Sequence, residues 1–106
     1  MAKFLWKASY TQAGVKGVAS EGGSSRREAV RAAAESVGGT LEGFYFAFGD
    51  ADVYVIADLP DNEAAMAISI AINGTGTVAL ETVPLLTAED VDAAAKREVN
   101  FRPAGG

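Results

Sequence analysis

Three acidic side chains are the best candidates in this sequence for acid–base chemistry. Asp50 and Asp52 lie at a turn between two apolar segments, and Glu81 interrupts a third apolar segment. A carboxyl group held in apolar surroundings has a raised pKa and can serve as a general base. The alternative is structural, because Asp accepts backbone hydrogen bonds in turns and Glu81 would lie on an exposed edge strand. Both interpretations stay open for the three residues.

Four aromatic side chains form a second set, suited to binding a small ligand. Aromatic walls with a few hydrogen-bonding groups are typical of ligand pockets, and we predict such a pocket between a β-sheet and a partner subunit. The same residue types are common in plain protein–protein interfaces. The set is Trp6, Tyr10, Tyr45 and Tyr54. Whether Tyr45 shares a face with Tyr54 depends on the register of their strands.

A glycine-rich approach to a predicted helix suggests an anion site. Residues 22–27 read Gly-Gly-Ser-Ser-Arg-Arg, which would bring free backbone N–H groups and guanidinium groups together at a helix N-terminus. Ser25, Arg26 and Arg27 are therefore candidates to bind a phosphate or a carboxylate. The alternative is a capped helix with solvated arginines, and the spacing differs from that of a phosphate-binding P-loop.

The absence of His and Cys from the sequence excludes several classes of site. The chain has no thiol nucleophile, no imidazole base and no ordinary zinc ligands, and it cannot hold haem through His or Cys. We therefore predict no metal and no cofactor. Any acid–base chemistry would have to use Asp, Glu, Lys or Tyr.

Charge and hydropathy limit the partners. The net charge is −5 and the nine Lys and Arg residues are scattered, which argues against binding nucleic acid or an anionic membrane surface. No apolar stretch reaches the about 20 residues that span a bilayer. Residues 1–7 show no apolar signal-peptide region. We therefore expect a cytoplasmic protein.

Periodicity and capping signals predict the elements that would position these residues. The 106 residues are expected to form one domain. We predict strands at 3–11, 40–48, 52–59 and 77–85, helices at 25–37, from Asp61 or Asn62 to Gly74 and at 87–99, a loop at 12–23 and an extended tail at 100–106. Ser25 and Glu28 fit a capping box at the start of the first helix. The order β-α-β-β-α-β, with a core at about 3–85 and an extra C-terminal helix, indicates an α+β ferredoxin-like fold.

The predicted strands are apolar on both faces. In the first strand, Phe4, Trp6 and Tyr10 are expected on one face and Leu5 on the other. In the second strand, Leu41, Gly43 and Tyr45 are expected on one face, with Phe44, Phe46 and Phe48 on the other. In the third strand, Val53, Val55, Ala57 and Leu59 are expected on one face, with Tyr54 and Ile56 on the other. Two helices can cover only one face, and soluble monomers rarely expose apolar patches beyond a few hundred Å². We therefore predict a homodimer that pairs sheet to sheet and buries on the order of 2,000 Å². The alternative is a monomer whose C-terminal segment folds under the sheet.

Five short motifs resemble those of the GYD domain family. They are Tyr10-Thr11, Gly38-Gly39-Thr40-Leu41, Gly43-Phe44-Tyr45, Gly49-Asp50-Ala51-Asp52 and Pro60-Asp61-Asn62. The resemblance runs from about residue 3 to residue 95 and implies a dimeric α/β barrel with no established activity. The glycine and aspartate of the family's Gly-Tyr-Asp element map to Gly49 and Asp52, whereas Ala51 stands at the tyrosine position. Any chemistry of that tyrosine is therefore not available to this chain.

Two functions remain open at this stage. The first is a homo-oligomeric module for binding a small ligand or for assembly, in which Lys96, Arg97, Phe101 and Pro103 would contact a neighbouring subunit and extend the dimer. The second rests on analogy with other dimeric α/β barrels, and fold alone does not imply function. It is a cofactor-independent oxygenase or isomerase acting on a small aromatic or enol-type substrate. A carboxylate directed into an enclosed cavity would favour the enzyme.

Overall fold

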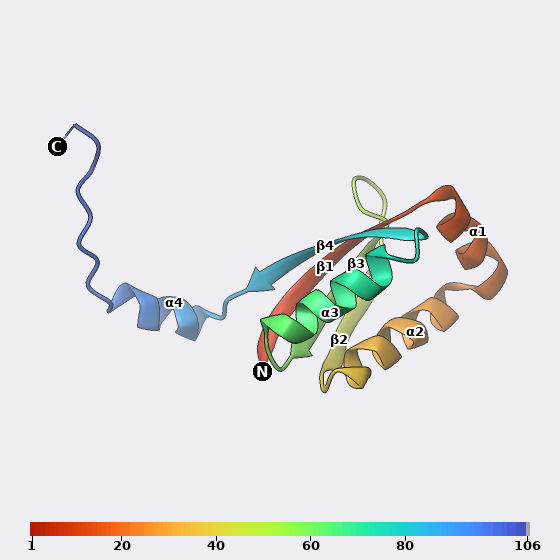
Figure 1. Cartoon of the computed structure of the whole chain (residues 1–106), viewed down its shortest axis with the longest axis horizontal. Coiled ribbons are helices and arrows are strands. Elements are labelled where there is room, and N and C mark those ends of the chain that lie inside the picture. Colours follow the sequence, from red (N-terminus) through yellow and green to blue (C-terminus); the bar gives the residue numbers. More distant parts are fainter. Residues whose placement is uncertain (106) are drawn as a thin grey trace.

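The computed structural model describes residues 1–105 as a sheet with helices on one side and a projecting C-terminal segment (Figure 1). The elements are β1 (Ala2–Tyr10), α1 (Gln12–Glu21), α2 (Gly23–Ser36), β2 (Thr40–Phe46), β3 (Val53–Leu59), α3 (Asn62–Asn73), β4 (Val78–Leu85) and α4 (Ala88–Ala95). The four strands form one sheet in the order β2-β3-β1-β4, and each neighbouring pair is antiparallel. This is the strand order of the ferredoxin-like fold, so the predicted α+β class is confirmed.

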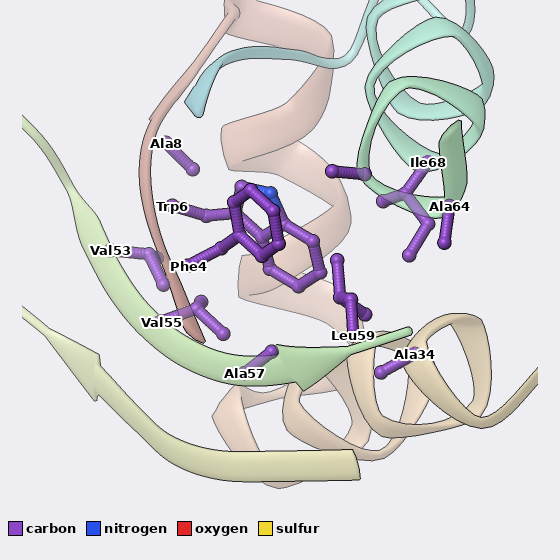
Figure 2. Close-up of a cluster of buried hydrophobic side chains, with 11 residues drawn as sticks. Phe4, Trp6, Ala8, Ala34, Val53, Val55, Ala57, Leu59, Ala64 and Ile68 are labelled. Carbon is purple, nitrogen blue, oxygen red and sulfur yellow. The ribbon is translucent and has the colours of Figure 1, made fainter. Parts of the chain in front are cut away.

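The two faces of the sheet differ in what covers them. Residues of β3 alternate between buried and half-buried along the whole strand, because α2 and α3 pack on one face only. We call this the covered face, and the other the open face. The core of the covered face comprises Phe4, Trp6 and Ala8 of β1, Val53, Val55, Ala57 and Leu59 of β3, Ala34 of α2, and Ala64, Ala65 and Ile68 of α3. Figure 2 shows the strand side chains directed toward the two helices.

A β-bulge corrects the predicted facing of β2. Leu41 pairs with Ala57 and Gly43 pairs with Ile56, so the register shifts between Leu41 and Gly43. The extra residue of a bulge reverses the alternation of side chains along a strand. Leu41 therefore packs against the core of the covered face, whereas the sequence placed it on the same face as Gly43 and Tyr45.

Helix α1 occupies residues that were predicted to form a loop. The Thr11 side chain accepts a hydrogen bond from the Gly14 N–H and caps the helix. A Cβ at Gly14 would lie 1.9 Å from the backbone oxygen of Thr77, so this position needs glycine to let α1 approach the chain before β4. The glycines lower the intrinsic helix propensity of the segment, and the long-range contact that requires Gly14 does not show in the sequence.

The predicted capping box of α2 is also wrong. The helix begins at Gly23, its N-cap Gly22 has φ +85°, and no side chain caps it. The prediction for α3 is confirmed, because the Asp61 side chain accepts from the Ala64 N–H at 2.9 Å. Gly22 lies between α1 and α2 and turns the chain in a left-handed conformation that favours glycine.

Residues 86–105 form an arm that continues from β4 and leaves the body of the molecule (Figure 1). Thr87 and Asp90 make a reciprocal capping box at its helix α4, which ends at Ala95 rather than near residue 99. Every residue of the arm is exposed. The arm does not lie under the sheet, so the alternative of a monomer sealed by its own C-terminal segment is not what the structure shows. None of the described helices is long and apolar enough to cross a membrane.

Candidate functional site

A cavity of about 130 Å³ lies between the covered face and the helices α2 and α3. Its walls are mainly apolar and include Trp6, Phe44, Val53 and Val55 from the sheet, and Val30 and Ile72 from the helices. An apolar protein cavity of about 150 Å³ is known to hold a benzene ring. The cavity therefore has the size for a small molecule with one ring.

Polar groups gather at one end of this cavity. Tyr10, Arg26, Thr75 and Thr77 contribute to its lining. Three of them, Tyr10, Arg26 and Thr77, also line a shallower surface pocket beside α1. Because these three side chains border both hollows, they lie between the cavity and the surface pocket, and we call them the mouth of the cavity.

Asp52 fixes the position of Tyr10 in this mouth. Its carboxylate accepts the backbone N–H of Tyr10 at 2.8 Å, and its own backbone N–H donates to the Ala8 carbonyl at 2.8 Å. Burial raises the pKa of the Tyr10 phenol, and the nearby Arg26 guanidinium offsets only part of this effect. The phenol therefore keeps its proton at neutral pH and remains a hydrogen-bond donor.

Arg26 is the only residue of the predicted anion set that reaches the cavity. Its Nη1 lies 3.3 Å from a carboxylate oxygen of Glu21 on α1. Arg27 pairs instead with the neighbouring Glu28, whose pKa it lowers, and Ser25 is exposed. A guanidinium carries five N–H donors in a planar fork, so the contact with Glu21 leaves Arg26 with donors for another acceptor.

Two buried polar atoms on the covered face have no hydrogen-bond partner among the described residues. They are Trp6 Nε1 and Thr82 Oγ1, and the two residues are cross-strand partners between β1 and β4. Trp6 is 1% exposed and lines the cavity. A buried donor without a partner costs about 1–3 kcal/mol.

The four predicted aromatic residues do not share one site. Trp6 and Tyr10 line the cavity, on the side of the helices rather than on the side expected for a partner. Tyr45 and Tyr54 lie opposite each other on β2 and β3, and Tyr54 pairs with Lys7 rather than with Trp6. These two tyrosines are therefore on the open face.

The three predicted carboxylates all lie outside the cavity. Asp52 is bound to the backbone of Tyr10. Asp50 and Glu81 are exposed and border a shallow surface hollow together with Lys7 and Ser9. In the part of the chain that the structure describes, no three acidic side chains lie close enough together to hold a metal ion. The structure therefore separates Asp50 and Glu81 from the candidate ligand site, whereas Asp52 lies beside Tyr10 at its mouth and does not line the cavity.

The open face carries an apolar band. Ile56, Leu5 and Val83 are cross-strand neighbours on β3, β1 and β4. Tyr54 precedes Ile56 by two residues in β3 and lies on the same face, and all four side chains are only half-buried. The band runs across the sheet, and none of the described helices packs on it.

The charged side chains of the open face are paired. Lys3 contacts the carboxylates of Glu42 and Asp58, the latter at 3.0 Å, and both contacts raise its pKa. Lys7 lies 3.8 Å from Glu81 on the neighbouring strand. Each lysine of this face thus has an acidic partner within the same sheet.

Sequence reasoning missed Thr82 and the helical walls of the cavity. The signal for Thr82 was present, because it alternates with Glu81 and Val83 and so falls on the covered face with Leu80. A hydroxyl group in a buried strand position needs a partner. The walls from α2 and α3 depend on how the helices pack, which periodicity does not give.

The chain matches one known family over almost its whole length. The family model described as GYD domain matches residues 4–95, a range that spans the sheet, the cavity, the open face and α4. The described residues 96–105 of the arm lie beyond it. No curated protein and no solved structure matched the chain.

Proposed function

The chain belongs to the GYD domain family, and from that premise we propose that it is a small-ligand-binding protein that acts as a homodimer. The observation that carries the proposal is the apolar cavity with polar side chains, among them Tyr10 and Arg26, in its lining. Apolar walls with a few convergent polar groups are the usual make-up of a ligand site. The open face supplies the separate argument for a second copy.

Binding fits the cavity better than catalysis does. The titratable side chains in its lining are Tyr10 and Arg26. The Tyr10 pKa is raised, and a guanidinium stays charged in proteins, so neither group is a base at neutral pH. A cofactor-independent oxygenase or isomerase would need a base in contact with its substrate, and none of Asp50, Asp52 and Glu81 lines the cavity.

A second copy fits the open face because of its charge pairing. Burying an ion without a partner is costly, but Lys3 and Lys7 already have acidic partners in the same sheet. Four strands about 4.8 Å apart and about 25 Å long give a face of roughly 20 by 25 Å. The flat area is thus about 500 Å², somewhat below the about 800 Å² per partner in a standard protein interface.

Ligand binding is tested with one-ring probes and a matched pair of variants. The chain has a single tryptophan, Trp6, so its fluorescence reports directly on the cavity. We expect benzoate or benzyl alcohol to change this fluorescence with a millimolar or tighter Kd, confirmed by calorimetry. Ala33→Leu narrows the cavity and should abolish binding, whereas Ala32→Leu adds the same side chain to the exposed side of α2.

Two results would overturn this proposal. The first is the absence of binding by any one-ring probe to the folded wild-type protein at concentrations of several millimolar. The second is equal binding by the Ala33→Leu and Ala32→Leu variants, which would place the probes outside the cavity. Circular dichroism and thermal unfolding of both variants establish that each is folded before the titrations are compared.

A further inference from the structure

We propose that the cavity takes a small carboxylate, with an apolar body the size of one ring inside and the carboxylate group at the mouth against Arg26 and Tyr10. The inference rests on the proposed ligand-binding function and names the chemical class of the ligand. It follows from the distribution of polar groups around the cavity, from the charge and hydrogen-bond donors of Arg26, and from the volume of the cavity.

The lining is asymmetric along the cavity. Trp6, Val53 and Val55 belong to the buried core, whereas Tyr10, Arg26 and Thr77 border the surface pocket as well. A ligand with one apolar end and one polar end fits this arrangement in a single orientation. A wholly apolar ligand would gain nothing from the donors of the mouth, where Arg26 is paired with Glu21.

The donors at the mouth select an anion. Arg26 contributes a positive charge, and the protonated phenol of Tyr10, whose pKa is raised by burial, contributes a neutral donor. No acidic side chain lines the cavity itself. A planar guanidinium binds a carboxylate through two parallel hydrogen bonds, which are stronger than hydrogen bonds between neutral groups.

Glu21 does not prevent a ligand carboxylate from binding to Arg26. It lies 3.3 Å from Arg26 in the surface pocket rather than in the cavity, and its side chain is 49% exposed. Exposed ion pairs contribute little to stability, so a ligand carboxylate can compete for the guanidinium. Glu21 also explains how the free protein keeps the Arg26 charge compensated.

The volume of the cavity limits the size of the apolar part of the ligand. About 130 Å³ accommodates one aromatic ring, which excludes nucleotides and long-chain fatty acids from full enclosure. The class is therefore a compact aromatic or branched carboxylic acid.

The test compares three probes of equal size and different charge. Benzoate, benzyl alcohol and benzylamine are titrated at fixed ionic strength and neutral pH, with calorimetry and Trp6 fluorescence as readouts. We expect benzoate to bind about tenfold more tightly than benzyl alcohol, as one hydrogen bond to a charged group implies, and benzylamine to bind most weakly.

Variants then assign the preference to Arg26. Arg26→Gln should weaken benzoate binding about tenfold and leave benzyl alcohol unchanged, whereas Lys16→Gln removes an equal charge from the exposed surface of α1 and should change neither. Glu21→Gln removes the competitor and should tighten benzoate binding. Arg26→Lys keeps the charge without the planar fork and should give an intermediate affinity, which provides a second measurement if Arg26→Gln unfolds.

The outcomes separate this inference from the proposed function. Equal affinity for benzoate and benzyl alcohol, or equal losses of both with Arg26→Gln, would overturn the choice of a carboxylate and leave ligand binding intact. Tighter binding of benzylamine would do the same. Failure of all three probes to bind the folded protein would overturn both proposals together.

Discussion

The two faces of the sheet are built from the same strands but differ in how their polar groups are paired. In β3, Val55 points into the core of the covered face and Ile56 lies on the open face. The covered face is buried and yet holds polar atoms without partners, at Trp6 and Thr82. The open face is accessible and yet its lysines are paired. Paired groups suit a surface that another protein chain covers, whereas the covered face keeps an unfilled cavity with Tyr10 and Arg26 in its lining.

Ile56→Asp places a carboxylate at the centre of the apolar band on the open face. A two-fold interface contains the change twice, and each new carboxylate would be buried without a partner. We expect the dimer Kd to rise by about 1,000-fold or more, equivalent to about 4 kcal/mol, measured by sedimentation velocity over a range of micromolar concentrations. Met66→Asp on α3 makes the same kind of change at a residue that is 60% exposed and should leave the dimer intact.

A wild-type chain that stays monomeric over that range would contradict the proposed dimer. An Ile56→Asp variant that dimerises as well as Met66→Asp would place the interface on another surface. In either case the ligand-binding proposal would stand, because it concerns the covered face alone.

One leucine on each face allows their contributions to folding stability to be measured separately. Leu59 is 0% exposed on the covered face, whereas Leu5 is half-buried on the open face. We expect Leu59→Ala to lower the free energy of unfolding by about 2–5 kcal/mol. Leu5→Ala should cost less than about 1 kcal/mol in dilute protein, since folding of one subunit buries less apolar area at Leu5 than at Leu59. The cost should increase as the protein concentration rises and the dimer forms.

Urea denaturation of both variants at two protein concentrations provides the measurement. Equal losses that do not depend on concentration would show that the open face contributes to the fold of one subunit in the same way as the covered face. The distinction between the two faces would then be wrong.

Thr82→Val tests the unpaired hydroxyl of the covered face. Valine has nearly the same shape as threonine and removes a buried polar atom that has no partner in the described structure. We expect the free energy of unfolding to rise by about 1 kcal/mol, measured by thermal and urea unfolding. Thr77→Val removes a hydroxyl that is exposed and lies 2.7 Å from the Thr75 hydroxyl, and should bring no gain. A loss of stability with Thr82→Val would mean that its hydroxyl has a partner in solution.

The fold was predictable where the signal is local. The alternation of β3 gave its two faces, and Asp61 caps α3 at one of the two predicted positions. The failures have long-range causes. Helix α1 was missed because Gly14 serves a contact with the Thr77 backbone, and Leu41 was placed on the wrong face because the bulge depends on the register with β3.

The candidate site was only partly predictable, for a similar reason. Trp6 and Tyr10 were named from residue type, and their period-two spacing with Phe4 already placed them together. Their neighbours Arg26 and Thr77 belong to other elements, and only packing brings them to the same mouth. A cavity is volume that side chains leave unfilled, and neither periodicity nor composition measures it.

The smallest effect is expected from removing the arm. All residues from 86 to 105 are exposed, and α4 makes no substantial packing against another described element. A chain that ends at Leu85 should therefore keep its free energy of unfolding within about 0.5 kcal/mol, the range of ordinary surface changes, with unchanged benzoate affinity and an unchanged dimer. Only an assembly larger than the dimer should be lost, because Phe101 is 75% exposed and available to a neighbouring dimer. Urea unfolding and sedimentation equilibrium measure both quantities, and a truncated chain that falls to monomers would show that the arm, rather than the open face, holds the two copies together.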